Sequence, residues 1–187
     1  MRPQKVLDKE ILEGLTQEFR SKGYEGASLK DLADATGLKK ASLYHRFPNG
    51  KQEMANAVLN HLGNWVDENV FQALKDENNN PHIRLKNALS QVRALYDRGN
   101  KSCILRALSM QSGLELFQNQ VQNSMKEWVE AFKTIGLAFN QSKENADKNA
   151  LRALIEIQGG LVVAKGLNDI SVFEDTLGYI EHRYLNS

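Results

Sequence analysis

The chain has 187 residues, of which 41% are hydrophobic and 25% charged, and its formal net charge is +1. This length allows one sizeable core, or a small domain joined to a larger one. No run of 18 apolar residues exists, which argues against a membrane-spanning helix and a membrane partner. The first ten residues lack an apolar stretch, so we expect no secretory signal and a cytoplasmic protein. Cys103 is the single cysteine and cannot form an internal disulfide.

The first two predicted helices are defined by periodicity and by end signals. Apolar residues recur at every fourth position from Leu7 to Phe19 and predict an amphipathic helix. Ser28 is suited to cap a second, short helix, and Asp31 adds a carboxylate to its first turn. Gly37 is expected to end this helix, because glycine takes a left-handed conformation at low cost.

The later elements are also predicted to be helices. A third short helix carries KKASLYHRF and ends at Pro48, and Asn49 is a candidate cap for a long fourth helix at about 50–74. A polar break at 75–81 follows. No useful stretch alternates between apolar and polar residues, so the predicted class is all-α with about nine helices. The remaining helices are expected at roughly 82–98, 103–112, 114–140, 145–167 and 170–185.

The segment 28–51 has the spacing of a helix-turn-helix, in which the second helix enters the DNA major groove. Small Ala33 allows close helix approach, and Gly37 makes the turn. Residues 1–51 carry a net charge of +3 and residues 52–187 a net charge of −2, a bias too mild to identify a DNA-binding protein by itself. Donors suited to phosphates and base edges occupy the outward positions: Lys39, Lys40, Ser42, Tyr44, His45 and Arg46.

The stretch ASLKDLADATGLKKASLYHRFPNGKQEMANAVL resembles the DNA-binding domain of TetR-family transcriptional regulators. Its glycine, its Leu-Tyr pair and its phenylalanine fall in the family's register, over about the first sixty residues. The resemblance implies an N-terminal helix-turn-helix domain at 1–51 and a C-terminal ligand-binding and dimerisation domain at 52–187. It implies base contacts by Lys40, Ala41 and Ser42. It implies phosphate contacts by Ser28, Tyr44, His45 and Lys51.

Two positions depart from the family's pattern. Lys39 stands where the family often has a serine or threonine cap, so the contacts of this candidate DNA-binding residue stay open. NGKQ replaces the commoner Ser-Lys-Glu. A helix-turn-helix that serves only as a structural element is the alternative interpretation.

The predicted helix at 145–167 carries apolar residues around most of its circumference, so we expect burial both by its own domain and by a partner subunit. Gly159 and Gly160 lower helix stability and fit a close approach by another backbone. The resemblance implies a homodimer formed by the last two helices, and the alternative is an ordinary core helix. The candidate interface residues are Leu151, Leu154, Ile155, Gly159, Val162, Phe173, Leu177 and Ile180.

The middle helices are rich in aromatic residues and methionine. The family's inducer pocket implies that some of them line a cavity for a small apolar or aromatic ligand. Core packing is the alternative for each residue, as it is for Cys103 against a redox role. The candidate pocket residues are Trp65, Tyr96, Met110, Phe117, Met125, Trp128, Phe132 and Gln158.

Enzyme function is not supported by any motif in the sequence. G-x-S-x-G, H-E-x-x-H and a phosphate-binding loop are missing, and the four histidines have no partners at metal-ligand spacing. We therefore expect no enzyme activity, no metal and no cofactor. The sequence predicts a ligand-responsive repressor that binds an inverted-repeat DNA operator as a dimer. A helical interaction protein of the same fold without operator binding is the alternative.

Overall fold

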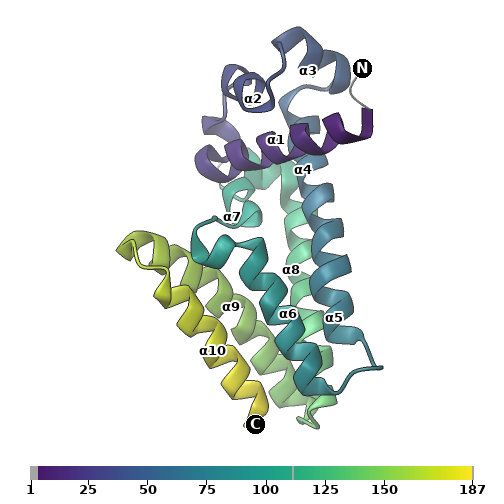
Figure 1. Ribbon diagram of the computed structural model, residues 1–187, viewed down its shortest axis with the longest axis vertical. Coiled ribbons are helices and arrows are strands. Elements are labelled where there is room, and N and C mark those ends of the chain that lie inside the picture. Colours follow the sequence, from purple (N-terminus) through teal and green to yellow (C-terminus); the bar gives the residue numbers. More distant parts are fainter. Residues whose placement is uncertain (1–3, 111, 187) are drawn as a thin grey trace. The chain divides into compact units, whose positions relative to one another are not determined.

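The structure is a computed structural model that describes residues 4–110 and 112–186 (Figure 1). Within these ranges the chain forms helices and no strand, so the predicted all-α class is confirmed. The side chain of Leu7, on which part of the first pattern rests, lies outside the described residues. The α-helices are α1 (Gln4–Gly26), α2 (Leu29–Thr36), α3 (Lys40–Arg46), α4 (Lys51–Val66), α5 (Gln72–Lys75), α6 (Pro81–Leu95), α7 (Ile104–Leu108), α8 (Ser112–Ala138), α9 (Lys143–Leu167) and α10 (Ser171–Leu185).

Two further helical segments complete the order. The π-helical segment η1 (Asp67–Phe71) joins α4 to α5 without interruption, so these three make one long helix and the described residues hold nine α-helices. The 3₁₀ segment η2 (Asp97–Gly99) follows α6. No helix in the described ranges has the length and apolar character that crossing a membrane requires.

Contacts divide the chain into two compact units, which we describe separately. Unit 1 comprises Met1–Gly63 and Cys103–Val121, and unit 2 comprises Asn64–Ser102 and Gln122–Ser187. The helices α4 and α8 therefore each contribute to both units. These packing units have other bounds than the predicted domains 1–51 and 52–187, and the functional division at residue 51 stays a prediction.

The core of unit 1 forms around α1. Ile11, Leu15 and Phe19 are almost completely buried, as their spacing of four residues predicts. Gly14 allows α2 to pack closely on α1, because a Cβ at this position would lie 2.3 Å from the carbonyl oxygen of Ala35. The helix α7 also packs on α1, where Ala107 lies close to Gly23, and belongs to the same unit.

One predicted cap is wrong. The fourth helix begins at Lys51, directly after Gly50, which has a φ of 68°. Asn49 precedes that turn and contributes its backbone N–H instead, which donates to Oε2 of Glu53 at 2.8 Å. The carboxylate of Glu53 thus takes an amide ahead of the helix, where a negative charge is favoured.

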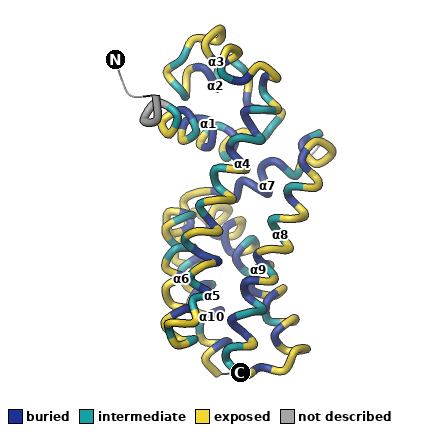
Figure 2. Tube along the Cα trace, turned by 90° about the vertical axis from the view of Figure 1, so that its right-hand side faces the viewer, coloured by how far each residue is buried: buried dark blue, intermediate teal, exposed yellow. Residues whose placement is uncertain are grey.

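The core of unit 2 forms where α10 packs on α9 and α6. Tyr184 is fully buried, and its hydroxyl donates to the carbonyl oxygen of Phe132 at 3.1 Å. Burial raises the pKa of the Tyr184 hydroxyl well above its usual value. Gly160 allows the close contact of α9 with α10, because a Cβ there would lie 2.8 Å from Oγ1 of Thr176. Both helices carry buried and exposed residues along their length, coloured dark blue and yellow in Figure 2.

Candidate nucleic-acid interface

The turn between α2 and α3 has the predicted geometry. Gly37 ends α2 in the left-handed conformation with a φ of 66°. The backbone N–H of Leu38 donates to the carbonyl oxygen of Ala33 at 3.1 Å, which closes the turn. The prediction that a glycine at this position makes the turn is therefore confirmed.

The helix α3 separates a buried side from an exposed one. Leu43 is 1% exposed and Phe47 9%, so these two side chains anchor α3 in unit 1. Tyr44 is 45% exposed although it is aromatic. The predicted DNA-facing residues of this segment are all exposed in the structure: Lys39, Lys40, Ala41, Ser42, Tyr44 and His45.

Arg46 differs from these neighbours because its guanidinium pairs with another helix. Its Nη2 forms an ion pair with Asp8 of α1, and the Arg46 side chain is only partly exposed. This pair joins α3 to α1 and thereby supports the orientation of the exposed face. The sequence pattern counted Arg46 among the outward donors and did not indicate this partner.

Ser28 caps α2 through a reciprocal pair with Asp31. The hydroxyl of Ser28 donates to Oδ2 of Asp31 at 2.6 Å and accepts from the backbone N–H of Asp31 at 3.1 Å. Nζ of Lys22 lies 3.0 Å from Oδ1 of the same carboxylate. The hydrogen bond from the Ser28 hydroxyl, followed by that from Lys22, lowers the pKa of Asp31 to about 2. Since this hydroxyl already has two partners, a phosphate contact by Ser28 requires a rearrangement of the cap.

Lys51, at the first position of α4, also has partners within unit 1. Its ammonium donates to the carbonyl oxygen of Ala27 at 3.3 Å and lies 4.6 Å from the centroid of the Tyr24 ring. Gly50 precedes it, and a Cβ on that glycine would lie 3.5 Å from Cε1 of Tyr44. The structure thus brings Tyr44 and Lys51, two predicted phosphate contacts, to either side of one glycine. Tyr24 was not singled out from the sequence, which offers no local pattern that predicts this contact.

The predicted dimer residues divide into two groups. Leu151, Ile155 and Val162 are 52%, 61% and 52% exposed, and Gly159 has open space where its Cβ would be. The other four pack into the core of unit 2 and are not available as a contact surface: Leu154, Phe173, Leu177 and Ile180. Further exposed apolar residues of the same two helices were missed: Val163, Leu167 and Tyr179.

The predicted ligand-pocket residues are not brought together in one unit. Met110 and Phe117 belong to unit 1, where Met110 is 57% exposed and Phe117 is fully buried. Trp128 and Phe132 pack against each other in unit 2 with ring centroids 6.2 Å apart, and both are buried. Tyr96 is also buried there. The remaining three residues of unit 2 are half-buried: Trp65, Met125 and Gln158.

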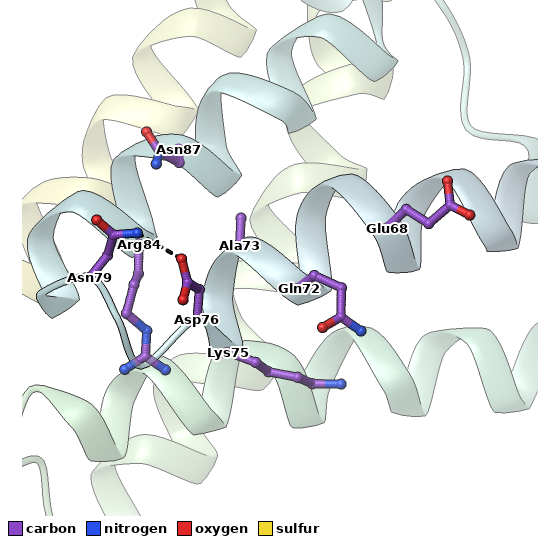
Figure 3. A pocket seen from close by; sticks show the side chains of 8 residues that line it. All are labelled: Glu68, Gln72, Ala73, Lys75, Asp76, Asn79, Arg84 and Asn87. Atoms are coloured by element: carbon purple, nitrogen blue, oxygen red, sulfur yellow. Dashed lines mark hydrogen bonds between the residues drawn. The ribbon is translucent and has the colours of Figure 1, made fainter.

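A pocket of about 420 Å³ lies in unit 2, between η1–α5 and α6 (Figure 3). Arg84 is almost completely buried, and its Nε and Nη2 donate to the carbonyl oxygen of Leu74 at 2.8 and 2.5 Å. Hydrogen bonds from Asn79 and then Asn78 lower the pKa of Asp76. None of the predicted pocket residues lines this space. The lining is polar: Glu68, Gln72, Ala73, Lys75, Asp76, Asn79, Arg84 and Asn87.

Comparison with known proteins agrees with this geometry. Residues 11–58 match the family described as "Bacterial regulatory proteins, tetR family". The chain is 25% identical over 162 residues to the uncharacterized HTH-type transcriptional regulator YxaF of Bacillus subtilis (strain 168), covering 83% of both. It is 22% identical over 125 residues to the HTH-type transcriptional repressor DhaR of Mycobacterium sp. (strain GP1), covering 66% of this chain and 62% of DhaR. A TetR transcriptional regulator of known structure from Legionella pneumophila has the same fold, with a TM-score of 0.78, 21% identity and 98% coverage of both chains.

A short exposed helix that carries lysines, set after a left-handed turn and supported by α1, is the arrangement of a helix-turn-helix DNA-binding protein. The relatives are transcriptional regulators, and this protein is a DNA-binding transcriptional regulator as well. Residues 11–58 match the DNA-binding domain of the TetR family.

Proposed function

We propose that this protein is a repressor that binds an inverted-repeat operator as a homodimer and responds to a small ligand. The exposed polar face of α3 is the observation that carries the proposal. Six predicted contact residues in and beside this helix are exposed, whereas Leu43 on its other side is 1% exposed. Lysine and hydroxyl side chains on such a face suit both phosphates and base edges. The name of DhaR supports repression as the sign of regulation.

Within this proposal the residues of the interface have different tasks. Lys40, Ala41 and Ser42 contact base edges, and Tyr44, His45 and Lys51 contact phosphates. Lys39, at the N-cap of α3, is exposed, so its ammonium is accessible to DNA. Ser28 contributes a phosphate contact only if its hydrogen bonds with Asp31 rearrange.

The proposed dimer forms through the exposed apolar residues of α9 and α10. Leu151, Ile155 and Val162 follow one another on α9 at spacings of four and seven residues, which puts them on one face. Gly159, between them, has open space where a Cβ would lie. A contiguous apolar face of this kind is expected to be covered by a partner. A twofold dimer presents two recognition helices about 34–36 Å apart, which predicts an inverted-repeat operator.

Two regions of unit 2 suit different classes of ligand. The predicted aromatic residues of unit 2 suit a small apolar or aromatic ligand, whereas the pocket beside Arg84 has a polar lining. Thermal melts with an indole probe and with a glutamine probe distinguish these classes, because only a bound molecule raises the midpoint. A ligand that regulates also changes operator affinity, and by no more than its own difference in affinity for the two states.

The proposal is tested by measuring binding to DNA fragments from around the gene at several salt concentrations. Specific binding is expected, with an affinity that falls steeply as salt rises, because phosphate contacts release counterions. Failure to bind any fragment more tightly than a scrambled duplex would refute operator binding. It would favour a helical interaction protein of the same fold.

A further inference from the structure

Tyr24 follows Gly23, whose φ of 71° interrupts α1 near its end, and it contacts both α4 and α8 within unit 1. The ammonium of Lys51 lies 4.6 Å from the centroid of its ring. The ring of Phe117 in α8 meets it edge to face, with centroids 5.2 Å apart and an angle of 76° between the planes. Burial raises the pKa of the Tyr24 hydroxyl, so the ring stays neutral at pH 7. Packing against α8 therefore holds the ring that faces Lys51.

Glu25 fixes the same turn of α1 to the first residue of α8. Its Oε1 accepts from the backbone N–H of Ser112 at 3.2 Å and from the Ser112 hydroxyl at 2.5 Å. The hydroxyl hydrogen bond is the main cause of the lowered pKa of Glu25, and the charge of Lys51 adds to it. The position of Tyr24 thus depends on two contacts with α8, one polar and one aromatic.

The ammonium of Lys51 has more N–H donors than its contact with Ala27 uses. An ammonium has three N–H donors, and one of them donates to the carbonyl oxygen of Ala27 at 3.3 Å. The face of an aromatic ring attracts a cation without cancelling its charge, whereas a carboxylate in the same place would neutralise it. An ammonium held by a ring can therefore still bind an anion that arrives from solvent.

The position of Lys51 is also coupled to the recognition helix. Gly50 precedes it with a φ of 68° and lies against the ring of Tyr44. A free lysine side chain loses rotamer entropy when it is fixed. A lysine that is already held loses less on binding, which favours affinity through preorganisation.

We propose that Tyr24 is a positioning residue for DNA binding: its ring holds the Lys51 ammonium in place for a backbone phosphate of the operator. This inference rests on the proposed function, in which Lys51 contacts a phosphate. It assigns a role in DNA binding to a residue that itself lies behind the interface. The aromatic face, and not the hydroxyl, is the group that acts.

The test compares Tyr24→Leu, which removes the ring, with Tyr24→Phe, which keeps it, in the full-length chain. Operator affinity is measured against salt concentration by fluorescence anisotropy. The slope of log affinity against log salt is negative. Tyr24→Leu is expected to make it shallower by about 0.9, the value of one phosphate contact. Tyr24→Phe is expected to keep the wild-type slope. Val58→Ala is the control for lost stability, because Val58 is fully buried in the same unit and lies about two helical turns from Lys51 on α4.

A second measurement needs no DNA and separates this inference from the proposed function. NMR should find the Cε protons of Lys51 shifted upfield by the ring current in wild type and Tyr24→Phe, and not in Tyr24→Leu.

In a double-mutant cycle, Tyr24→Leu should change the slope no further once Lys51→Ala is present. Equal slopes for wild type and Tyr24→Leu, or the same slope change in the Lys51→Ala background, would overturn the positioning role while operator binding stands. A wild-type protein that binds no duplex specifically would refute both.

Discussion

Replacing Ile155 with aspartate is expected to convert the proposed dimer into folded monomers. Full burial of an isoleucine side chain contributes about 1.5–3 kcal/mol, and Ile155 is 61% exposed in the single chain. Covering it in a dimer therefore contributes about 1–2 kcal/mol for each subunit, or about 2–4 kcal/mol for a twofold interface. This corresponds to a rise in the dissociation constant of roughly 30- to 1,000-fold. An unpaired carboxylate at the interface weakens association further.

The assay is sedimentation velocity over a range of protein concentrations, with two matched substitutions. Ile83→Asp places the same charge on α6, where Ile83 is 43% exposed, and should leave the dimer intact. Leu154→Ala changes the neighbouring residue, which is 7% exposed, and should lower the free energy of unfolding by about 2–5 kcal/mol, because it leaves a cavity. A dimer of Ile155→Asp as tight as that of wild type would show that this face of α9 is not the interface. Equal dissociation of Ile83→Asp would point to a nonspecific effect of charge.

Three further outcomes are expected. Gly14→Val should lower the free energy of unfolding by about 1–3 kcal/mol in denaturant titrations, since its side chain would meet the carbonyl oxygen of Ala35; an unchanged midpoint would contradict the close packing of α1 and α2. Asp31 has a folded pKa of about 2, below its ordinary 3.8, so its contribution to stability is present above about pH 4 and is lost as the pH falls toward 2. Ser28→Ala should therefore lower the melting midpoint more at pH 7 than near pH 2, where mainly the lost hydrogen bond from the Asp31 backbone N–H remains. An equal difference at both pH values would argue against the hydrogen bond to the Asp31 carboxylate as a source of stability. Lys40→Ala should weaken operator binding by about 1–3 kcal/mol in competition assays while binding to random DNA changes little; an equal loss for both would make Lys40 a phosphate contact.

The elements whose causes are local could be predicted from the sequence. Ile11, Leu15 and Phe19 lie one turn apart on any α-helix, so their burial on one side follows from their spacing. Gly37 ends α2 because few other residues adopt its φ of 66° without strain. The exposure of Tyr44 and its neighbours on α3 could also be predicted. Leu43 and Phe47 face the core, so the other side chains of this short helix face outward.

Side-chain partners from distant parts of the chain could not be predicted in this way. Lys51 was expected to contact a phosphate, and the structure adds a contact with Tyr24, which is 27 positions earlier. The Arg46–Asp8 pair joins residues of two helices with no common pattern. Asn49 is a residue type that often caps helices, but the turn at Gly50 makes the helix start one residue later than expected. The side-chain oxygen that accepts a hydrogen bond at this helix start belongs to Glu53, and the backbone N–H of Asn49 donates to it.

The amino-acid sequence by itself determined that the chain is helical, that it turns at Gly37 and that it exposes a polar, lysine-bearing face after that turn, because each of these depends on residues within one or two helical turns. Only the tertiary structure decided which side of α9 is free. Leu154 and Ile155 are adjacent and chemically alike, yet one is 7% and the other 61% exposed. Leu154 lies in the core of unit 2 and Ile155 points away from it. The same holds for Gly160, which Thr176 of α10 approaches closely, and Gly159, which has open space at its Cβ position. Hydrophobicity drives a side chain out of water, but only the position of its neighbours determines whether it is covered.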